Sequence, residues 1–288
     1  MKKLLIIGSV HTELRTYVKA LPKGNEEAEI LSRHQTVSGG GYQAGRCFRM
    51  LGFPFTVICD PGEGVYGGFA REGAAELGIE LAEGSGEIGG CTFRMIDPAG
   101  NDAAFCGDGS EYPFSLTQVY DIDPDEYGAI AVYAEMLSSD GAEELVDVLR
   151  ELEMPLYLIF GEKSRDILPE ALEALIDLSP IMIMDESDAY ALNGAKERPD
   201  TIAQKLSAET RAAVMILSGS GVLYCSPDDT WVAPCSEKPQ CHVWAAYCIA
   251  AFMAGVDRRN GMMFANEASA GNDPAAMKQR LAGMILHR

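Results

Sequence analysis

The chain has 288 residues, of which 47% are hydrophobic, 23% are charged and 30 are glycine. This composition is that of an ordinary globular protein, and it excludes disordered, collagen-like and low-complexity architectures. The chain contains 23 basic and 43 acidic residues, which give a net charge of −20. Because so acidic a surface repels phosphate backbones and anionic lipid, we expect neither a nucleic-acid nor a membrane partner.

The eight cysteines form no Cys-x-x-Cys pair and have no histidine cluster beside them at zinc spacing. The apolar run at residues 4–7 is too short for a signal peptide, and no stretch approaches the ~20 apolar residues of a membrane span. We therefore expect a reduced, cytoplasmic protein whose thiols are mostly buried.

Apolar runs and partial alternation predict strands along the first part of the chain. They are residues 4–7, 29–37, 55–59, 91–96 and 103–106. The last two flank an Asp-Pro-Ala-Gly turn and are predicted to form a hairpin. Helical periodicity predicts two helices, residues 44–52 and 67–77, and a glycine ends each of them.

After residue 128 the pattern changes to alternating strands and helices. Strands are predicted at residues 129–133, 155–160, 181–184, 213–217 and 221–225. Helices are predicted at residues 141–152, 169–177, 186–192, 243–255, 262–271 and 274–286. This alternation is typical of a mainly parallel sheet covered by helices on both faces, and thus of the α/β class. No linker or internal repeat divides the chain, so residues 1–288 are predicted to form a single domain.

Six segments carry a pattern that is known from one family. In chain order they are IIGSVHTELRTYVKALPKGNEEAE, SGGGYQAGRCFRMLG, GEGVYGGFAREGAAELGIEL, IMIMDESDAYALNG, ILSGSGVLY and AAYCIAAFMAG. Their order and spacing resemble those of the ribokinase/PfkB carbohydrate kinases over nearly the whole chain. The resemblance implies a ribokinase-like α/β fold with a small β-lid, whose strands are inserted at about 29–37 and 91–106.

The resemblance also implies an activity, which is the phosphorylation of a primary hydroxyl of a sugar or nucleoside by ATP with Mg²⁺. ATP then lies across the carboxyl ends of the strands. In the family, an Asp in a Gly-Ala-Gly-Asp turn takes the proton of the hydroxyl, and the N–H groups of the turn hold the developing negative charge. Lids of this kind sometimes pair in the family, which suggests a homodimer through the β-lid.

Four residues are implied to bind the substrate: Glu13, Gly39, Gly40 and Gln43. Glu13 stands where the family has an Asp and Gln43 where it has an Asn, and each adds a methylene that moves the polar group by about 1.5 Å. The glycines permit close approach of the backbone to a ligand. The alternative is a surface glutamate, a helix-start glutamine and a flexible turn with no ligand.

On the nucleotide and magnesium side the resemblance implies six residues: Asp185, Glu186, Ser218, Gly219, Gly221 and Asn266. Asp185 and Glu186 replace the Asn-Glu pair that places magnesium and phosphate through water, and no residue is implied to bind the metal directly. As alternatives, Asp185 caps a helix and Asn266 lies on a solvated helix face.

The family's catalytic turn is missing. Residues 240–246 align with Asp-Thr-Thr-Gly-Ala-Gly-Asp, but Val243 and Ala245 replace both glycines and Ala246 replaces the catalytic Asp. Loss of a general base costs roughly 10²–10⁴ in rate, and loss of an anion-binding turn costs a further ~10²–10³. His242, whose ordinary pKa suits a base, is a weak substitute.

Two hypotheses follow from the sequence. The first is a carbohydrate kinase whose activity is weak or lost. The alternative is a non-catalytic pseudokinase that binds a small, sugar-like hydroxylated ligand as a sensor or regulator.

Overall fold

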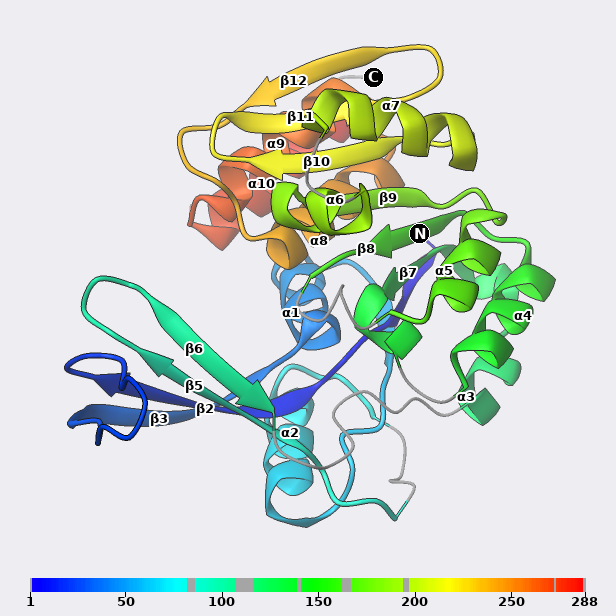
Figure 1. Ribbon diagram of the computed structural model, residues 1–288. Helices are drawn as coiled ribbons and strands as arrows, with labels where there is room; N and C mark the ends of the chain where they lie inside the picture. Colours follow the sequence, from blue (N-terminus) through cyan, green and yellow to red (C-terminus); the bar gives the residue numbers. More distant parts are fainter. Residues whose placement is uncertain are drawn as a thin grey trace.

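Two β-sheets organise the computed structural model, which describes residues 2–81, 86–106, 116–138, 141–161, 167–193, 197–271 and 273–286 (Figure 1). The larger sheet has eight strands in the order β12-β11-β10-β9-β8-β7-β1-β4. Its parallel strands are β1 (Lys3–Ile7), β4 (Phe55–Ile58), β7 (Tyr127–Tyr133), β8 (Leu156–Ile159), β9 (Ile181–Asp185) and β10 (Val214–Ser218). At one edge, β11 (Gly221–Cys225) and β12 (Thr230–Pro234) continue it in antiparallel fashion.

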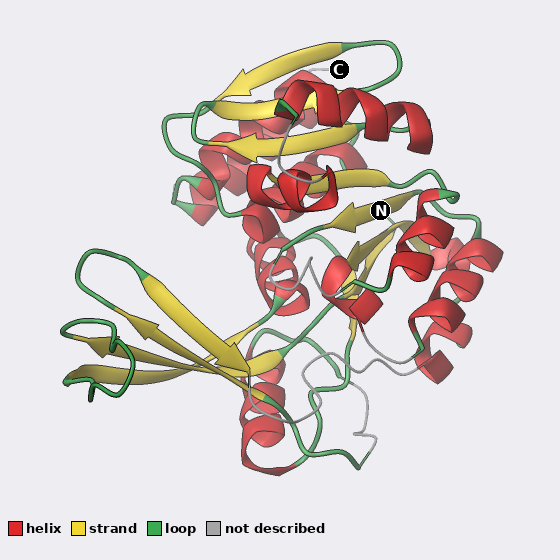
Figure 2. Cartoon of the chain, in the orientation of Figure 1, coloured by secondary structure: helices red, strands yellow, loops and turns green. Residues whose placement is uncertain are grey.

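Helices cover both faces of this sheet (Figure 2). One face carries α1 (Gly40–Leu51), α2 (Gly64–Glu76), α8 (Cys241–Met253), α9 (Arg258–Ser269) and α10 (Pro274–Leu286). The other carries α3 (Leu116–Tyr120), α4 (Ala142–Leu152), α5 (Pro169–Ile176), α6 (Glu186–Asn193) and α7 (Pro199–Thr210). The two faces bury separate cores because successive strand residues point in opposite directions: Leu4 and Ile6 face the first core, and Leu5 and Ile7 the second.

The smaller sheet projects from the body as a lid (Figure 1). Its strands, in the order β3-β2-β5-β6, are β3 (Ile30–Ser38), β2 (His11–Val18), β5 (Cys91–Ile96) and β6 (Asp102–Cys106). The predicted separate sheet of residues 29–37 and 91–106 is therefore present. It is held together by β2, which lies between its two predicted parts and was not predicted.

Six of the seven cysteines whose side chains the structure describes are buried. Burial raises the pKa of Cys47 and of Cys59 to about 12, so both remain protonated thiols. Within the described ranges, no helix is long and apolar enough to cross a bilayer.

Candidate functional site

A small cavity lies where the lid meets the body, and we refer to it as the lid cavity. Its lining residues are Ser9, His11, Ser38, Gly39, Gly40, Gln43, Glu135 and His242. They come from the carboxyl ends of β1 and β7, from the lid strands and from the first turns of α1 and α8. The cavity has a volume of about 60 Å³. Three of the four predicted substrate residues, Gly39, Gly40 and Gln43, thus lie together with His242.

The glycines at the start of α1 are required by packing. Gly39 caps the helix with φ of 110°, a conformation that favours glycine, and a Cβ there would lie 2.3 Å from the carbonyl oxygen of Ser9. A Cβ on Gly40 would lie 2.2 Å from the ring of Tyr133. The Gly40 N–H also donates a 3.1 Å hydrogen bond to the Ser9 hydroxyl. These contacts bring the beginning of α1 directly against the ends of β1 and β7.

Glu135 is a site residue that the sequence interpretation missed. It follows β7 in the 3₁₀ turn Ala134–Ser138 and is only 3% exposed. The Ser9 hydroxyl donates a 2.9 Å hydrogen bond to its Oε1, whereas its buried Oε2 has no hydrogen-bond partner within the described residues. A buried acceptor without a partner is costly, so Glu135 presents an unused acceptor in the lid cavity. The sequence contains one signal for this residue, which is an acidic side chain shortly after the end of an apolar strand.

His242 reaches the lid cavity from the first turn of α8. Its ring packs edge-on against Tyr133, with centroids 5.2 Å apart and planes at 69°. Its Nε2 lies so close to Gly161 that a Cβ on that residue would be 1.8 Å from it. The imidazole is therefore held in place between the ends of β7 and β8, beside Glu135.

Glu13, the fourth predicted substrate residue, lies in the lid. It is 2% exposed, and its Oε1 accepts hydrogen bonds from Arg15 Nε at 2.7 Å and Arg94 Nε at 3.2 Å. Burial raises the pKa of this carboxyl. The hydrogen bond and charge of Arg15, a hydrogen bond with Ser38 and the charge of Arg94 together lower it by more, so the pKa lies below its ordinary value. The carboxylate thus ties β2 to β5, and contact with a ligand remains a prediction.

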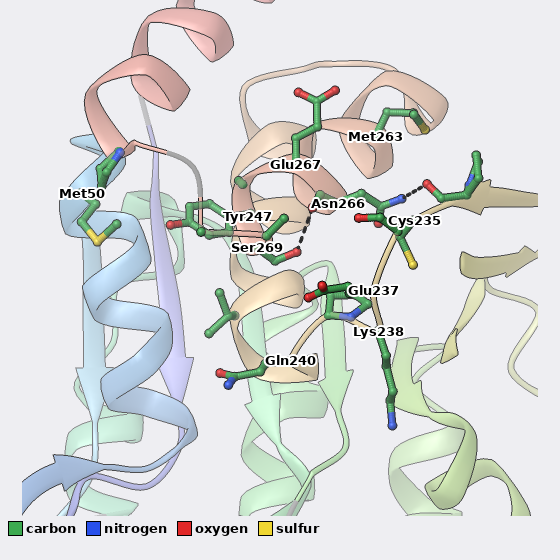
Figure 3. Close-up of a pocket in the computed structure, with 18 of the residues that line it drawn as sticks. Met50, Cys235, Glu237, Lys238, Gln240, Tyr247, Met263, Asn266, Glu267 and Ser269 are labelled. Carbon is green, nitrogen blue, oxygen red and sulfur yellow. Dashed lines mark hydrogen bonds between the residues drawn. The ribbon is translucent and has the colours of Figure 1, made fainter. Parts of the chain in front are cut away.

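A second, larger cavity of about 790 Å³ opens between α8, α9 and the segment after β12, and we refer to it as the α8–α9 cavity (Figure 3). Asn266 lies in its wall, but its amide group is used within the protein. The amide nitrogen donates to the carbonyl oxygens of Ala233 (3.3 Å) and Pro234 (2.9 Å), and Oδ1 accepts from Trp244 Nε1 at 2.7 Å. Asn266 therefore holds β12, α8 and α9 together.

The remaining predicted nucleotide residues lie at the ends of β9 and β10. Asp185 pairs through Oδ2 with Lys238 Nζ at 3.1 Å, and Lys238 lines the α8–α9 cavity. Glu186 accepts a 3.0 Å hydrogen bond from the Tyr190 hydroxyl. Ser218 donates a 2.9 Å hydrogen bond to the carbonyl oxygen of Gly221 and so closes the turn that also contains Gly219. Asp185 is connected to the cavity through Lys238, and Ser218 through Cys235, whose Sγ donates to the Ser218 carbonyl oxygen at 3.8 Å.

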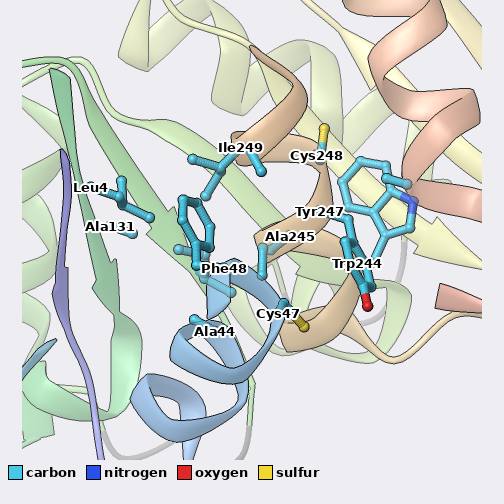
Figure 4. Packing of buried hydrophobic residues seen from close by; sticks show 14 of the residues in the cluster. Leu4, Ala44, Cys47, Phe48, Ala131, Trp244, Ala245, Tyr247, Cys248 and Ile249 are labelled. Carbon is cyan, nitrogen blue, oxygen red and sulfur yellow. The ribbon is translucent and has the colours of Figure 1, made fainter. Parts of the chain in front are cut away.

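Helix α8 begins at Cys241, two residues before its predicted start, and this changes the site. Trp244 already donates its N–H to the carbonyl oxygen of Gln240 at 2.9 Å, so residues 241–246 form a regular helix. Trp244, Ala245 and Ala246 are at most 1% exposed and belong to the hydrophobic core. Ala245 faces α1, whereas Trp244 points away from α1 and bonds to Asn266 of α9 (Figure 4). Ala246, the position that the sequence resemblance assigns to the family's general base, therefore lies in the hydrophobic core.

Comparison with known proteins supports the fold. A scan against models of protein families and a search of curated proteins find no match. Among solved structures, the chain is similar to Giardia lamblia ribokinase, with a TM-score of 0.80 and 16% identity over 98% of this chain and 99% of that one. Arabidopsis thaliana ribokinase complexed with ribose and ATP matches with a TM-score of 0.77 and 17% identity, over 99% of this chain and 98% of that one. A Burkholderia thailandensis nucleoside kinase in complex with inosine matches with a TM-score of 0.73 and 15% identity, over 97% of this chain and 96% of that one.

The chain is thus an α/β protein of the kind that carries a β-lid on a mainly parallel sheet. Its fold is that of the ribokinases, and the resemblance to the ribokinase/PfkB carbohydrate kinases is confirmed at the level of the fold.

Proposed function

We propose that this is a cytoplasmic protein that binds a small, sugar-like hydroxylated ligand in the lid cavity, and that its phosphoryl transfer is weak or lost. The observation that carries the proposal is the continuous helix at residues 241–246. Catalysis of phosphoryl transfer rests mainly on positioning and on stabilisation of charge. A helix that uses the N–H groups of Trp244, Ala245 and Ala246 internally cannot offer them to a developing negative charge.

The lid cavity suits hydroxyl groups. Glu135 offers an unused carboxylate oxygen, Gln43 offers an amide that both donates and accepts, and His242 offers an imidazole. The cavity volume of about 60 Å³ is well below the roughly 300–1,000 Å³ that is typical of ligand pockets. A sugar-sized ligand therefore requires the lid, which carries His11 and Ser38, to move outwards.

We further propose that ATP or ADP binds in the α8–α9 cavity, as the ATP complex of the Arabidopsis ribokinase suggests. Lys238 and Arg46 line this cavity and would pair with phosphate groups. In the described part of the chain, no cluster of three or more His, Cys, Asp or Glu side chains could hold a metal. Asp185, whose Oδ1 has no hydrogen-bond partner in that part, would help to place Mg²⁺ through water, together with the phosphates. Bound Mg²⁺ neutralises phosphate charge.

A second candidate function is an active kinase in which His242 replaces the missing Asp. The position of His242 in the lid cavity beside Glu135 favours it, because a general base must lie within reach of the substrate hydroxyl.

Thermal unfolding and ADP release together distinguish the two functions. Both measurements use a set of sugars, polyols and nucleosides. Thermal unfolding is followed with each compound in the presence and absence of MgADP, and ADP release is followed with each compound and MgATP. We expect at least one hydroxylated compound to raise the Tm, since a ligand at 100 times its Kd adds about 2.7 kcal/mol. The natural protein and the His242→Ala variant are expected to release ADP at the same rate. Turnover that this variant loses would establish the second candidate, and the absence of any stabilising compound would refute ligand binding.

We also propose that the lid forms a homodimer. Large apolar side chains are exposed on its strands, including Leu31 at 56% and Phe105 at 54%, and Phe105 stacks on Phe93 with centroids 5.3 Å apart. Sedimentation velocity is expected to show a dimer that Phe105→Glu converts to a monomer, because a charge opposes burial of this surface. Val232→Glu is the control, since Val232 is 53% exposed at the far edge of the large sheet. A monomeric natural protein, or equal effects of both variants, would contradict the proposal.

A further inference from the structure

A third cavity of about 500 Å³ lies at the end of the molecule opposite to the lid cavity. It opens at the amino ends of β9 and β10 and at the carboxyl end of α8, whereas the lid cavity lies at carboxyl ends of strands and at the amino end of α8. We refer to it as the basal cavity, and the residues that define it are Tyr157, Met215, Tyr224, Val256, Arg211 and Arg258. It shares no lining residue with the other two cavities.

The buried part of the basal cavity wall combines apolar side chains with the two tyrosines Tyr157 and Tyr224. Tyr157, Met215 and Val256 are at most 7% exposed. Tyr224 is 1% exposed, and its buried hydroxyl has no hydrogen-bond partner within the residues described. Buried tyrosine hydroxyls usually find a partner, and one without a partner is costly. A bound molecule with a polar atom would supply the missing hydrogen bond.

The ring of Tyr224 is fixed from two sides. It stacks on Trp231, with centroids 5.4 Å apart and planes at 27°, and the guanidinium of Arg258 lies 5.8 Å from its centroid. The hydroxyl is thus held by a rigid ring in the wall of the cavity rather than by a mobile side chain.

Two exposed arginines, Arg211 and Arg258, carry positive charge at the rim. Neither forms an ion pair with any carboxylate that the structure describes. Two carboxylates, Asp257 and Asp228, also line the cavity. Asp257 caps α9 and accepts hydrogen bonds from the backbone N–H and the side-chain amide of Asn260, and Asp228 is exposed on the β11–β12 turn. In a chain with a net charge of −20, two arginines at one cavity that make no ion pair within the described residues favour an anionic group there.

We propose that the basal cavity binds a small aromatic molecule that carries one anionic group. The aromatic body would pack against Met215 and Val256 and the partly buried Phe252, and the anionic group would pair with Arg211 and Arg258. The Tyr224 hydroxyl would bond to a polar atom of the ligand. This site is independent of the proposed function, because it uses none of the residues assigned to the hydroxylated ligand or the nucleotide.

Methyl NMR of the full chain labelled with [methyl-¹³C]methionine tests the proposal, with 2-naphthoate as the probe and neutral 2-naphthamide for comparison. Saturable shifts are expected for the Met215 methyl and not for Met50 and Met263, which line the α8–α9 cavity. Naphthoate should bind about tenfold more tightly than naphthamide, the ratio that one hydrogen bond to a charged group supplies.

Arg258→Gln is expected to weaken naphthoate about tenfold, for the same reason. Arg259→Gln is the matched control, because Arg259 lies over Trp231 and next to Asp229 without lining the cavity. Arg211→Gly is a second variant that is compatible with folding, since Arg211 has φ of 54°, where glycine is favoured. The absence of a saturable Met215 shift, equal affinity for both probes, or equal loss in Arg258→Gln and Arg259→Gln would overturn the proposal.

Discussion

The Ala246→Asp variant is expected to be strongly destabilised and to gain no kinase activity. Ala246 is 1% exposed and packs in the core between α8 and its neighbours. An uncompensated buried charge costs about 3–5 kcal/mol, which is a large part of the 5–15 kcal/mol that is typical of a domain. Denaturant unfolding measures the loss, and ADP release from MgATP measures the activity.

The Ala246→Asn variant is the matched control, because it has the same shape and no charge. Burial raises the pKa of a carboxyl above its value of about 3.9 in the unfolded chain. The penalty of the Asp variant relative to the Asn variant is therefore absent below that pH, and it grows as the pH rises towards the folded-state pKa. If the two variants are equally stable at pH 7 and the Asp variant releases more ADP, position 246 faces the substrate and our account of α8 is wrong.

The Glu135→Gln variant is expected to be more stable than the natural protein and to bind the hydroxylated ligand more weakly. The buried Oε2 of Glu135 has no hydrogen-bond partner in the described chain, and such a group costs about 1–3 kcal/mol. Removing the charge relieves part of this cost. It also removes a charged hydrogen bond to the ligand, and we expect the Kd to rise about 10- to 100-fold.

Thermal unfolding and calorimetric titration, with a compound that stabilises the natural protein, measure both effects of Glu135→Gln. Glu143→Gln is the control, since it makes the same chemical change at an exposed position of α4 and should alter neither quantity. A substitution that raises the stability of the protein and weakens ligand binding indicates that the replaced residue is functional. Unchanged ligand affinity in Glu135→Gln would show that Glu135 has no part in the site.

Elements with a strong apolar pattern could be predicted from the sequence, and those without one could not. The apolar runs of β1 and β7 predicted the centre of the sheet because both faces of these strands are buried. β2 was missed because its sequence, HTELRTYV, mixes charged residues into a lid strand whose Glu13 and Arg15 pair with each other. The segment of α7 was missed as well, because its apolar residues are few and widely spaced.

The candidate site was predictable only in part. Gly39, Gly40, Gln43 and His242 were identified and do lie in one cavity. Glu135 was missed because its importance comes from its burial in the fold. Burial places one carboxylate oxygen beside Ser9 and leaves the other without a hydrogen-bond partner among the described residues. That the two residues meet depends on the pairing of β1 with β7, across more than a hundred residues of chain.

Helix α8 contributes to the walls of the three cavities described above. His242 lines the lid cavity, Val243 and Tyr247 line the α8–α9 cavity, and Phe252 lines the basal cavity. Residues 244–251 are all buried, so apolar side chains surround the helix on every side. Because rotating or sliding this helix in any direction would expose apolar surface, we expect α8 to keep its position. We therefore expect the adjustment that the proposed ligand requires to come from the lid, which projects from the body (Figure 1).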